Sequence, residues 1–367
     1  SVNGILKDAV GNVHFNILGY NSGNLRQQAH ALSNDVIKAI TGRNGIAQTR
    51  ILYKMKTGPR AYEVFVSDYD GHRPVALTAD NTLTESPLWA PGNGEVFYTS
   101  WMKIGGVENT TVIRHKMKTG KRTVFSRFKG LNTGGDLSPQ GMVAMVLSRG
   151  FNPDVWVAPM GWEFLKDIKG KQLKQMCRTR EAESGPAWSP DGKWLCFATR
   201  ANGRRMLVKV AAQGGPMVPV PTPGAINPSD PAWSPDGRSI AYTSYLSGFP
   251  DVIVSHLYEG RMTFPANGNT VVHNFLPAFS PDGSKLAFWS NRNGNPDIYV
   301  VNADGTGDVR QLTNHPGIDE SPTWSPNGQQ IAFTSDRTGS PQIYVIGADG
   351  TGFRRLTYET YCTRPTW

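Results

Sequence analysis

The chain has 367 residues, including 40 glycines and 26 prolines, with 10% aromatic and 38% hydrophobic residues. This mix excludes a disordered chain and suits many short strands joined by tight turns. No run of about 18 apolar residues occurs, so we expect neither a membrane-spanning helix nor direct membrane insertion. Ser1 is followed by neither a charged nor an apolar leader segment. We therefore expect any export signal to have been removed.

The net charge of +9 is unevenly distributed. Residues 1–60 carry +6 and residues 101–182 carry +9, which leaves −6 on the rest of the chain. The second stretch contains a basic sector formed by Lys116, Lys118, Lys121, Arg122, Arg127, Lys129, Lys166, Lys169, Lys171 and Lys174. Such a sector can attract an acidic partner or an anionic surface, or it can be a solvated face that keeps the protein soluble. We expect no nucleic acid among the partners.

Residues 1–48 have a pattern of their own. Two alternating segments, 2–8 and 12–18, predict a hairpin, and a helix follows whose apolar face comprises Leu25, Ala29, Leu32, Val36, Ile37 and Ile40. Asn21 or Ser22 is the expected cap of this helix, and Gly42 is its expected end. One hairpin and one helix bury too little apolar surface to fold alone. We therefore predict that residues 1–48 are a partial α/β amino-terminal domain.

An internal repeat covers most of residues 49–367. Its full copies read GPAWSPDG at 185–192, DPAWSPDG at 230–237, LPAFSPDG at 276–283 and SPTWSPNG at 321–328. Weaker copies surround Trp89 and Leu137, and a half-copy, RPTW, ends at Trp367. Successive copies are separated by 48, 51, 45, 46, 45 and 43 residues.

Each repeat predicts four antiparallel strands, which is one propeller blade. The Pro-x-Trp segment is the first strand, an Asp-Gly or Asn-Gly pair makes a hairpin turn, and an alternating run such as IAFTS is the second strand. Second strands begin near Ile51, Val96, Met142, Leu195, Ile240, Leu286 and Ile331. The count predicts an all-β, seven-bladed propeller over residues 49–367. We expect the final RPTW strand to join residues 50–78 and close the ring, and the repeated aromatic residues to pack between blades.

The repeat at 324–350, WSPNGQQIAFTSDRTGSPQIYVIGADG, resembles the propeller of TolB, the periplasmic component of the Tol-Pal envelope system of Gram-negative bacteria. Residues 26–54 resemble the last helix of the TolB amino-terminal domain and the segment that leads into its first blade. The resemblance implies a periplasmic, non-enzymatic protein-binding scaffold that supports envelope integrity. TolB propellers of the well-known type have six blades, so a six-bladed ring is the alternative to the count of seven.

The resemblance also implies a partner and a binding face. The family binds the peptidoglycan-associated lipoprotein through the loops that precede its Pro-x-Trp strands. Matching residues in this sequence, with those of the neighbouring loop, are His273, Asn274, Leu276, Asn314, His315 and Glu320. Contacts with other Tol proteins such as TolA are implied for an extreme amino-terminal segment that residues 1–48 do not contain.

An enzyme is the competing hypothesis. The chain has no GxSxG motif and no hydrolase-sized region after the repeats, which speaks against a propeller peptidase. No repeated histidine or carboxylate position forms a catalytic set, so we predict no catalytic residue. The alternative that stays open is a TolB-like lyase or hydrolase acting on an anionic polysaccharide, which would suit the basic sector.

Five carboxylates recur near the predicted first strands: Glu85, Asp136, Glu183, Asp230 and Glu320. They could form a ring at the channel mouth that attracts calcium, or they could cap loop amides, which is the interpretation we favour. We therefore predict no cofactor and no metal, with calcium in the channel as the alternative. Cys177, Cys196 and Cys362 have no zinc-site spacing, and the sequence leaves open whether two of them pair.

Overall fold

The computed structural model of the protein describes residues 2–7, 9–11, 13–20, 23–104, 106–150, 152–177, 179–222, 224–245, 248–266 and 272–367. Over this part of the chain, no helix combines the length and the apolar character needed to cross a bilayer. All three cysteines, Cys177, Cys196 and Cys362, are free thiols.

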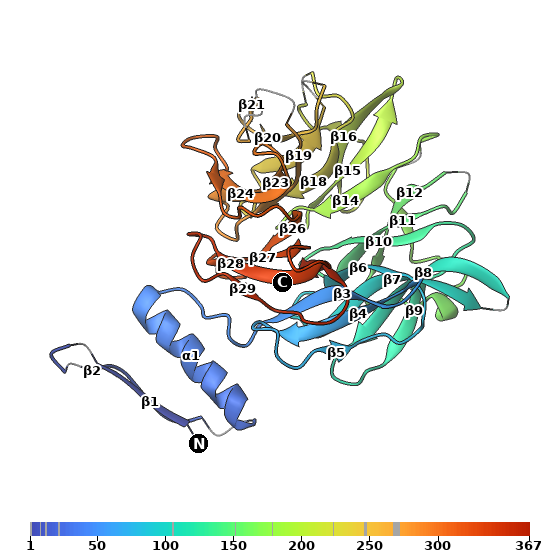
Figure 1. The fold of residues 1–367 in the computed structure, drawn as a ribbon. Coiled ribbons are helices and arrows are strands. Elements are labelled where there is room, and N and C mark those ends of the chain that lie inside the picture. Colours follow the sequence, from blue (N-terminus) through green and yellow to red (C-terminus); the bar gives the residue numbers. More distant parts are fainter. Residues whose placement is uncertain are drawn as a thin grey trace.

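Seven four-stranded antiparallel sheets form a closed ring of blades (Figure 1). Blade 1 consists of β30 (Cys362–Thr366), β3 (Arg50–Gly58), β4 (Ala61–Asp68) and β5 (Val75–Ala76); blade 2 of β6 (Thr84–Trp89), β7 (Glu95–Ile104), β8 (Val107–Lys116) and β9 (Arg122–Ser126). Blade 3 consists of β10 (Asn132–Leu137), β11 (Met142–Leu147), β12 (Asp154–Pro159) and β13 (Lys174–Gln175); blade 4 of β14 (Ser184–Trp188), β15 (Trp194–Ala201), β16 (Arg204–Ala211) and β17 (Val218–Pro219).

The remaining blades repeat the same order. Blade 5 consists of β18 (Ser229–Trp233), β19 (Ser239–Ser244), β20 (Asp251–His256) and β21 (Arg261–Thr263). Blade 6 consists of β22 (Asn274–Phe279), β23 (Lys285–Ser290), β24 (Asp297–Asn302) and β25 (Arg310–Gln311); blade 7 of β26 (Asp319–Trp324), β27 (Gln330–Ser335), β28 (Gln342–Gly347) and β29 (Arg354–Arg355). The prediction of seven blades is confirmed, and the six-bladed alternative is wrong.

The ring closes through its last strand. β30 pairs antiparallel with β3, with Leu52 opposite Thr366 and Met55 opposite Cys362. The indole nitrogen of Trp367 donates a hydrogen bond of 2.7 Å to the Thr49 hydroxyl. The closure predicted from the RPTW half-copy is therefore confirmed, and blade 1 is built from both ends of the propeller sequence.

The hydrophobic core is divided into clusters that lie between neighbouring blades. In one of them, Trp324 packs between Val300 of β24 and Phe333 of β27, and all three are buried. The Trp324 indole also donates a hydrogen bond of 2.9 Å to the carbonyl oxygen of Ala278 in blade 6. Trp233 does the same toward Ala187, at 3.0 Å. The repeated aromatic residue thus fastens one blade to the previous one, as predicted.

A β-bulge recurs in the first strand of the blades. The residue before the repeat proline has a left-handed backbone. This holds for Ser86, Asp230, Leu276, Ser321 and Arg364, whose φ values are 51°, 53°, 54°, 57° and 53°. A right-handed helical conformation is disfavoured before proline, and a bulge needs one residue out of register. The bulge turns the side chain of that residue out of the regular alternation of the strand. The backbone at this position is therefore nearly the same in these blades, and only the side chain differs.

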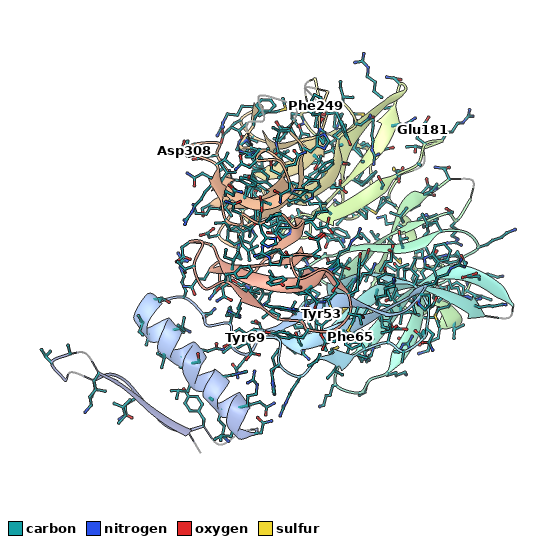
Figure 2. All side chains as sticks on the ribbon, in the orientation of Figure 1. Tyr53, Phe65, Tyr69, Glu181, Phe249 and Asp308 are labelled. Carbon is teal, nitrogen blue, oxygen red and sulfur yellow. The ribbon has the colours of Figure 1, made fainter. Side chains whose placement is uncertain are left out.

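The two faces of the ring carry different connections. We call the face that holds the loops before each first strand, and the hairpins between second and third strands, the first-strand face. The opposite face holds the Asp-Gly turns and the connections between third and fourth strands, and we call it the Asp-Gly face. Figure 2 places Phe249 and Glu181, which belong to the first-strand face, up and to the right of Asp308 and Tyr69, which belong to the Asp-Gly face.

The amino-terminal segment lies beside the propeller (Figure 1) and comprises the hairpin β1 (Val2–Lys7) and β2 (Val13–Tyr20) and the helix α1 (Leu25–Thr41). Asn24 caps the helix: its side chain accepts a hydrogen bond from the Gln27 amide, and the Gln27 side chain accepts one from the Asn24 amide. The expected caps, Asn21 and Ser22, lie outside the described residues. Gly42 ends the helix with φ of 70°, as predicted.

Ion pairs connect α1 to the Asp-Gly face of blade 1. Arg26 lies 3.2 Å from the Asp68 carboxylate and 2.5 Å from that of Asp70, and the His30 ring meets Tyr69 edge-on at 5.5 Å. The ends of the predicted apolar face are not covered, because Leu25 is 71% exposed and Ile40 63% exposed. The division into domains at residues 48 and 49 stays a prediction.

Removal of residues 360–367 tests the closure. This truncation deletes the first strand of blade 1, withdraws Trp367 from its cluster and exposes the edge of β3. We expect the free energy of unfolding to fall by at least about 4 kcal/mol, because buried Cys362 and half-buried Trp367 are lost together with the strand. Thermal and urea unfolding measure the loss. The exposed Tyr358→Ala variant is the control, and a truncated protein as stable as this control would contradict the closure.

Candidate functional site

An aromatic cluster lies on the first-strand face where blades 5 and 6 meet. The half-buried His273 ring stacks on Phe249 at 5.9 Å and meets Phe275 edge-on at 6.3 Å, and Phe275 stacks on Trp289 at 4.8 Å. Phe249 comes from the connection between β19 and β20, whereas the other rings belong to blade 6. The Asn291 side chain accepts a 2.7 Å hydrogen bond from the His273 amide and fixes this loop.

Leu276 and Asn274 have opposite surroundings although only one residue separates them. Leu276 occupies the bulge position of β22 and is 42% exposed. Asn274 is fully buried, donates a 2.8 Å hydrogen bond to Asp251 and accepts one of 3.3 Å from Arg292. Its side chain therefore holds the loop and does not reach the surface. We call Phe249, His273, Phe275, Leu276 and Trp289 the aromatic patch.

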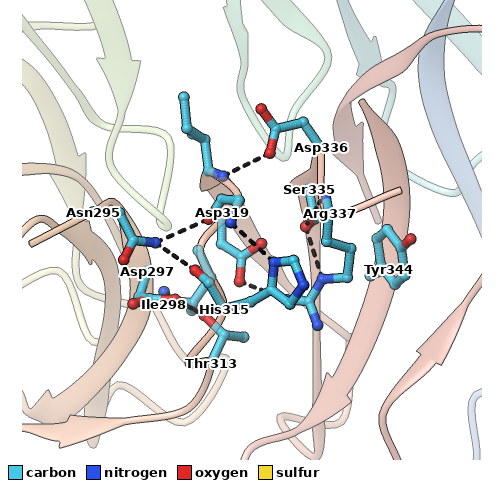
Figure 3. A network of polar contacts seen from close by, with 12 residues as sticks. Asn295, Asp297, Ile298, Thr313, His315, Asp319, Ser335, Asp336, Arg337 and Tyr344 are labelled. Atoms are coloured by element: carbon cyan, nitrogen blue, oxygen red, sulfur yellow. Dashed lines mark hydrogen bonds and ion pairs between the residues drawn. The ribbon is translucent and has the colours of Figure 1, made fainter. Parts of the chain in front are cut away.

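The next loop, residues 314–318, is fastened from both sides (Figure 3). The Asn295 amide of blade 6 donates to the carbonyl oxygens of His315, at 2.6 Å, and Gly317, at 2.9 Å. On the blade 7 side, the Asp336 carboxylate accepts a hydrogen bond of 2.7 Å from the Ile318 amide. The His315 ring turns back onto its own loop, because its Nδ1 accepts a hydrogen bond of 2.9 Å from the Gly317 amide.

A buried ion pair lies beneath this loop. Asp319 has no exposed side-chain surface, and its carboxylate lies 2.7 Å from the Arg337 guanidinium. Arg337 in turn stacks over Phe353 at 4.4 Å and Tyr344 at 5.1 Å. Asn314 is exposed and Glu320 is half-buried. The structure thus places the predicted contact residues along the adjoining edges of blades 6 and 7, on one face of the ring.

Two of the five recurring carboxylates cap backbone amides. Asp136 accepts a hydrogen bond of 2.7 Å from the Trp188 amide of the next blade and one of 2.8 Å from the Leu137 amide. Glu183 is buried and accepts a 2.8 Å hydrogen bond from the Val155 amide. Its carboxylate also accepts a hydrogen bond from the Cys177 thiol. Burial raises the pKa of Asp136 to about 6 and that of Glu183 above its usual range, against the opposing effect of these hydrogen bonds.

The other three carboxylates do not complete a ring. Glu85 lies 3.3 Å from the Lys54 ammonium, and Asp230 accepts a hydrogen bond of 2.7 Å from the Ser229 hydroxyl. Only Glu85 and Glu320 share a register position, opposite the equivalent threonines of the second strands. A shift of one residue at the bulge turns a side chain to another side, which separates the rest. Among the described residues, no group of three or more His, Cys, Asp or Glu side chains could hold a metal ion.

A hollow of about 890 Å³ opens at the channel, on the side of blades 2 to 4. Three arginines line it: Arg200 and Arg205, which are opposite each other in β15 and β16, and Arg364, which occupies the bulge of β30. Arg205 donates a hydrogen bond of 2.6 Å to the Ser184 hydroxyl. The hollow is therefore suited to anionic groups, although the carboxylate of Glu181 lies at its edge.

Sequence reasoning found His273 and Leu276 but missed Phe249, Phe275 and Trp289 of the aromatic patch, although one signal was present for Trp289. The second strands of blades 2, 5 and 7 carry threonine at positions 99, 243 and 334, where blade 6 carries Trp289. A large ring at a position that is small elsewhere in the repeat marks a local function. Phe249 had no such signal, because its contact with His273 crosses from one blade to the next.

Asp136 allows a test of the amide-capping interpretation. Its pKa is about 6 in the folded protein against an ordinary value of 3.8, so between these values the folded chain binds more protons than the unfolded chain. Stability from this group is therefore greatest at low pH and falls as the pH rises through about 6. Asp136→Asn cannot titrate. We expect the stability of the natural protein relative to this variant to fall by about 1–3 kcal/mol from about pH 4 to about pH 7. Urea unfolding measures it, and a constant difference would contradict the assigned burial.

Comparisons with known proteins agree with this architecture. The sequence matches the family described as TolB beta propeller domain over residues 37–230 and 228–367. The Tol-Pal system protein TolB of Francisella tularensis is 30% identical over 159 residues, which are 41% of this chain and 34% of that protein. The match therefore spans about a third of the length of this curated relative.

Two solved structures are similar to the fold. TolB from Acinetobacter baumannii has a TM-score of 0.65 and 23% identity, over 97% of this chain and 76% of that chain. An oligogalacturonate lyase from Vibrio parahaemolyticus has a TM-score of 0.60 and 17% identity, over 83% of this chain and 89% of that chain. At these identities the likeness shows the fold alone. Because the family match extends through all seven blades, the chain belongs to the TolB β-propeller family.

Proposed function

We propose that the protein is a non-enzymatic scaffold of the Tol-Pal type that acts in the periplasm and binds a peptidoglycan-associated lipoprotein through its first-strand face. Membership of the TolB β-propeller family supports the class of function. The observation that carries the proposal is the aromatic patch, in which stacked rings are accompanied by the exposed Leu276, the residue next to Phe275 in β22.

The surroundings of the patch have the anatomy of a protein interface. Such interfaces have an apolar, aromatic centre and a polar rim. Phe275, Trp289 and Leu276 provide the centre, and the neighbouring loop with Asn314, His315 and Glu320 provides the polar edge. Buried Asn274 contributes by holding the loop in place and not by direct contact.

The binding face is also preorganised. Hydrogen bonds from two blades fix the backbone of the 314–318 loop, and the Asn291 side chain fixes the start of β22. A partner that binds a loop already held in one conformation does not have to order it, and the cost in conformational entropy is smaller. Rigid presentation of side chains is what a scaffold requires.

A second candidate function rests on the arginine-lined hollow. Arg200, Arg205 and Arg364 could pair with the carboxylates of a uronic-acid polymer, and the enzyme would then be a lyase or hydrolase. An activity screen on uronic-acid polymers, run beside a pull-down against envelope lipoproteins, separates the two candidates. Turnover that is lost in Arg205→Ala would favour the enzyme. Capture of the lipoprotein without turnover would favour the scaffold.

The scaffold proposal predicts the effect of a double substitution in the patch. In His273→Ala with Leu276→Asp, a ring of the cluster is lost and a charge replaces the exposed apolar contact. We expect binding of a peptidoglycan-associated lipoprotein to weaken at least about tenfold, or about 1.4 kcal/mol, as measured by calorimetric titration. Folding should survive, because Asp tolerates the left-handed backbone of position 276.

The matched control is Tyr258→Asp, which introduces the same charge at a residue that is 73% exposed on the Asp-Gly face. This variant should bind as the natural protein does. Equal affinities of the double variant and the natural protein would move the binding site away from the aromatic patch.

A further inference from the structure

The connection between the third and fourth strands is much longer in blade 3 than in the other blades. Residues 160–173 join β12 to β13 and include a single turn of 3-10 helix, Phe164–Lys166. In blade 6, the same connection is residues 303–309, half as long, and it is shorter still in the remaining blades. We call residues 160–173 the blade 3 loop. An insertion of this length in a compact repeat is commonly functional.

Aromatic packing anchors the base of the loop. Trp162 is 3% exposed, meets Phe125 edge-on at 5.3 Å and stacks on Phe128 at 6.4 Å. Phe164 meets Phe128 edge-on at 5.0 Å. These rings fill the cluster between blades 2 and 3, so the loop is part of the core at its base.

Polar contacts fix the tip. The Asp167 carboxylate accepts hydrogen bonds from the amides of Lys171, at 2.9 Å, and Gln172, at 3.0 Å. Arg149 lies over the Phe128 ring at 4.8 Å and donates to the carbonyl oxygens of Lys169 and Gly170. The loop is therefore held in one shape although its tip is exposed.

The tip displays aliphatic side chains between lysines. Leu165 is 76% exposed and Ile168 is 63% exposed. Lys166 pairs with Glu163 at 3.0 Å, and Lys169 and Lys171 are exposed. Two large apolar groups exposed in this way on a rigid loop point to a binding surface.

The neighbouring blade adds to the positive charge. Lys118 and Lys121 are exposed in the connection between β8 and β9 of blade 2, the blade on which the loop packs. The hydrogen bond and charge of Lys166 lower the pKa of the Glu163 carboxyl, with a smaller effect of Lys121. The acidic groups of the loop are engaged, Glu163 by Lys166 and Asp167 by backbone amides. The surface around Leu165 and Ile168 is thus cationic.

We propose that the blade 3 loop docks on an anionic phospholipid bilayer, with Leu165 and Ile168 entering the headgroup region and Lys169 and Lys171 facing the lipid phosphates. Aliphatic side chains flanked by lysines bind well at the interface of an anionic bilayer. Burial of the apolar groups is favourable, and the negative surface potential attracts each nearby lysine. Protein interfaces favour tyrosine, tryptophan and arginine and are depleted in lysine. The composition of this tip therefore favours a bilayer over an acidic protein.

This contact is independent of the proposed lipoprotein binding. The blade 3 loop packs on blades 2 and 3, whereas the aromatic patch belongs to blades 5 and 6. It also goes beyond the expectation from the sequence that the protein makes no direct membrane insertion. Contact by two side chains needs no spanning segment, and the rigid loop supplies it.

Co-sedimentation of the full chain with vesicles tests the proposal. We expect binding to vesicles of phosphatidylglycerol and phosphatidylcholine, little binding to phosphatidylcholine alone, and weaker binding at high salt. Lys169→Gln with Lys171→Gln, and separately Leu165→Ser with Ile168→Ser, should each weaken binding at least about tenfold. All four side chains are exposed, so these variants should melt as the natural protein does.

The matched control for charge is Lys193→Gln with Lys285→Gln, two exposed lysines of blades 4 and 6, outside the blade 3 loop. This pair should leave vesicle binding unchanged. The proposal is overturned if the natural protein does not bind anionic vesicles, or if the control pair weakens binding as much as the loop pair does. Binding that depends on the lysines but not on Leu165 and Ile168 would also overturn it, in favour of an acidic macromolecular partner.

Discussion

The packing of each blade against its two neighbours is the constraint on which the rest of the structure depends. A four-stranded sheet of this size has two apolar faces, and the buried clusters lie between blades, so no blade has a core of its own. The repeated aromatic residue joins one blade to the previous one, and Trp367 joins the last strand to the first blade. Stability therefore belongs to the closed ring. The loops on both faces inherit their positions from it, which is why function can reside in loops without loss of precision.

The bulge before the repeat proline recurs at an equivalent position in several blades of this rigid ring. The side chain at that position differs from blade to blade. Leu276 and Arg364 have nearly the same backbone conformation, with φ of 54° and 53°. The first belongs to the aromatic patch of blades 5 and 6, and the second lines an arginine-rich hollow at the channel. A single residue at this position thus decides whether a blade offers an apolar or a cationic group. Divergence of function within the repeat requires no change of fold.

The sequence predicted the features that the repeat itself encodes. Turn pairs and alternating strands recur with a period, so the number of blades and the aromatic residue between blades followed from counting the copies. The half-copy at Trp367 predicted the closure. Features that depend on register or on contacts between blades did not follow. Amide capping by Asp136 and Glu183 was the interpretation favoured from the sequence, but the amides that they bind, those of Trp188 and Val155, are visible only in the structure. The burial of Asn274 depends on Asp251 of the previous blade. The separation of 51 residues before Trp188 is the longest between copies, but the blade 3 loop was not predicted from it, and its anchoring by Arg149 is visible only in the structure.

The uneven charge of the chain is concentrated in particular blades of the ring. The excess of +9 in residues 101–182 lies mainly in blades 2 and 3, whereas the aromatic patch is formed by blades 5 and 6. Because the blades are fixed relative to one another, a surface held by the cationic sector leaves the patch free on the far side of the ring. The helix α1 is attached to the Asp-Gly face of blade 1 through Arg26, so the amino-terminal segment occupies a third place on the ring. The cationic sector and the aromatic patch are thus separate surfaces of one ring. A rigid propeller with this division can bridge two different surfaces without any change of conformation, since each site is complete when the ring is closed.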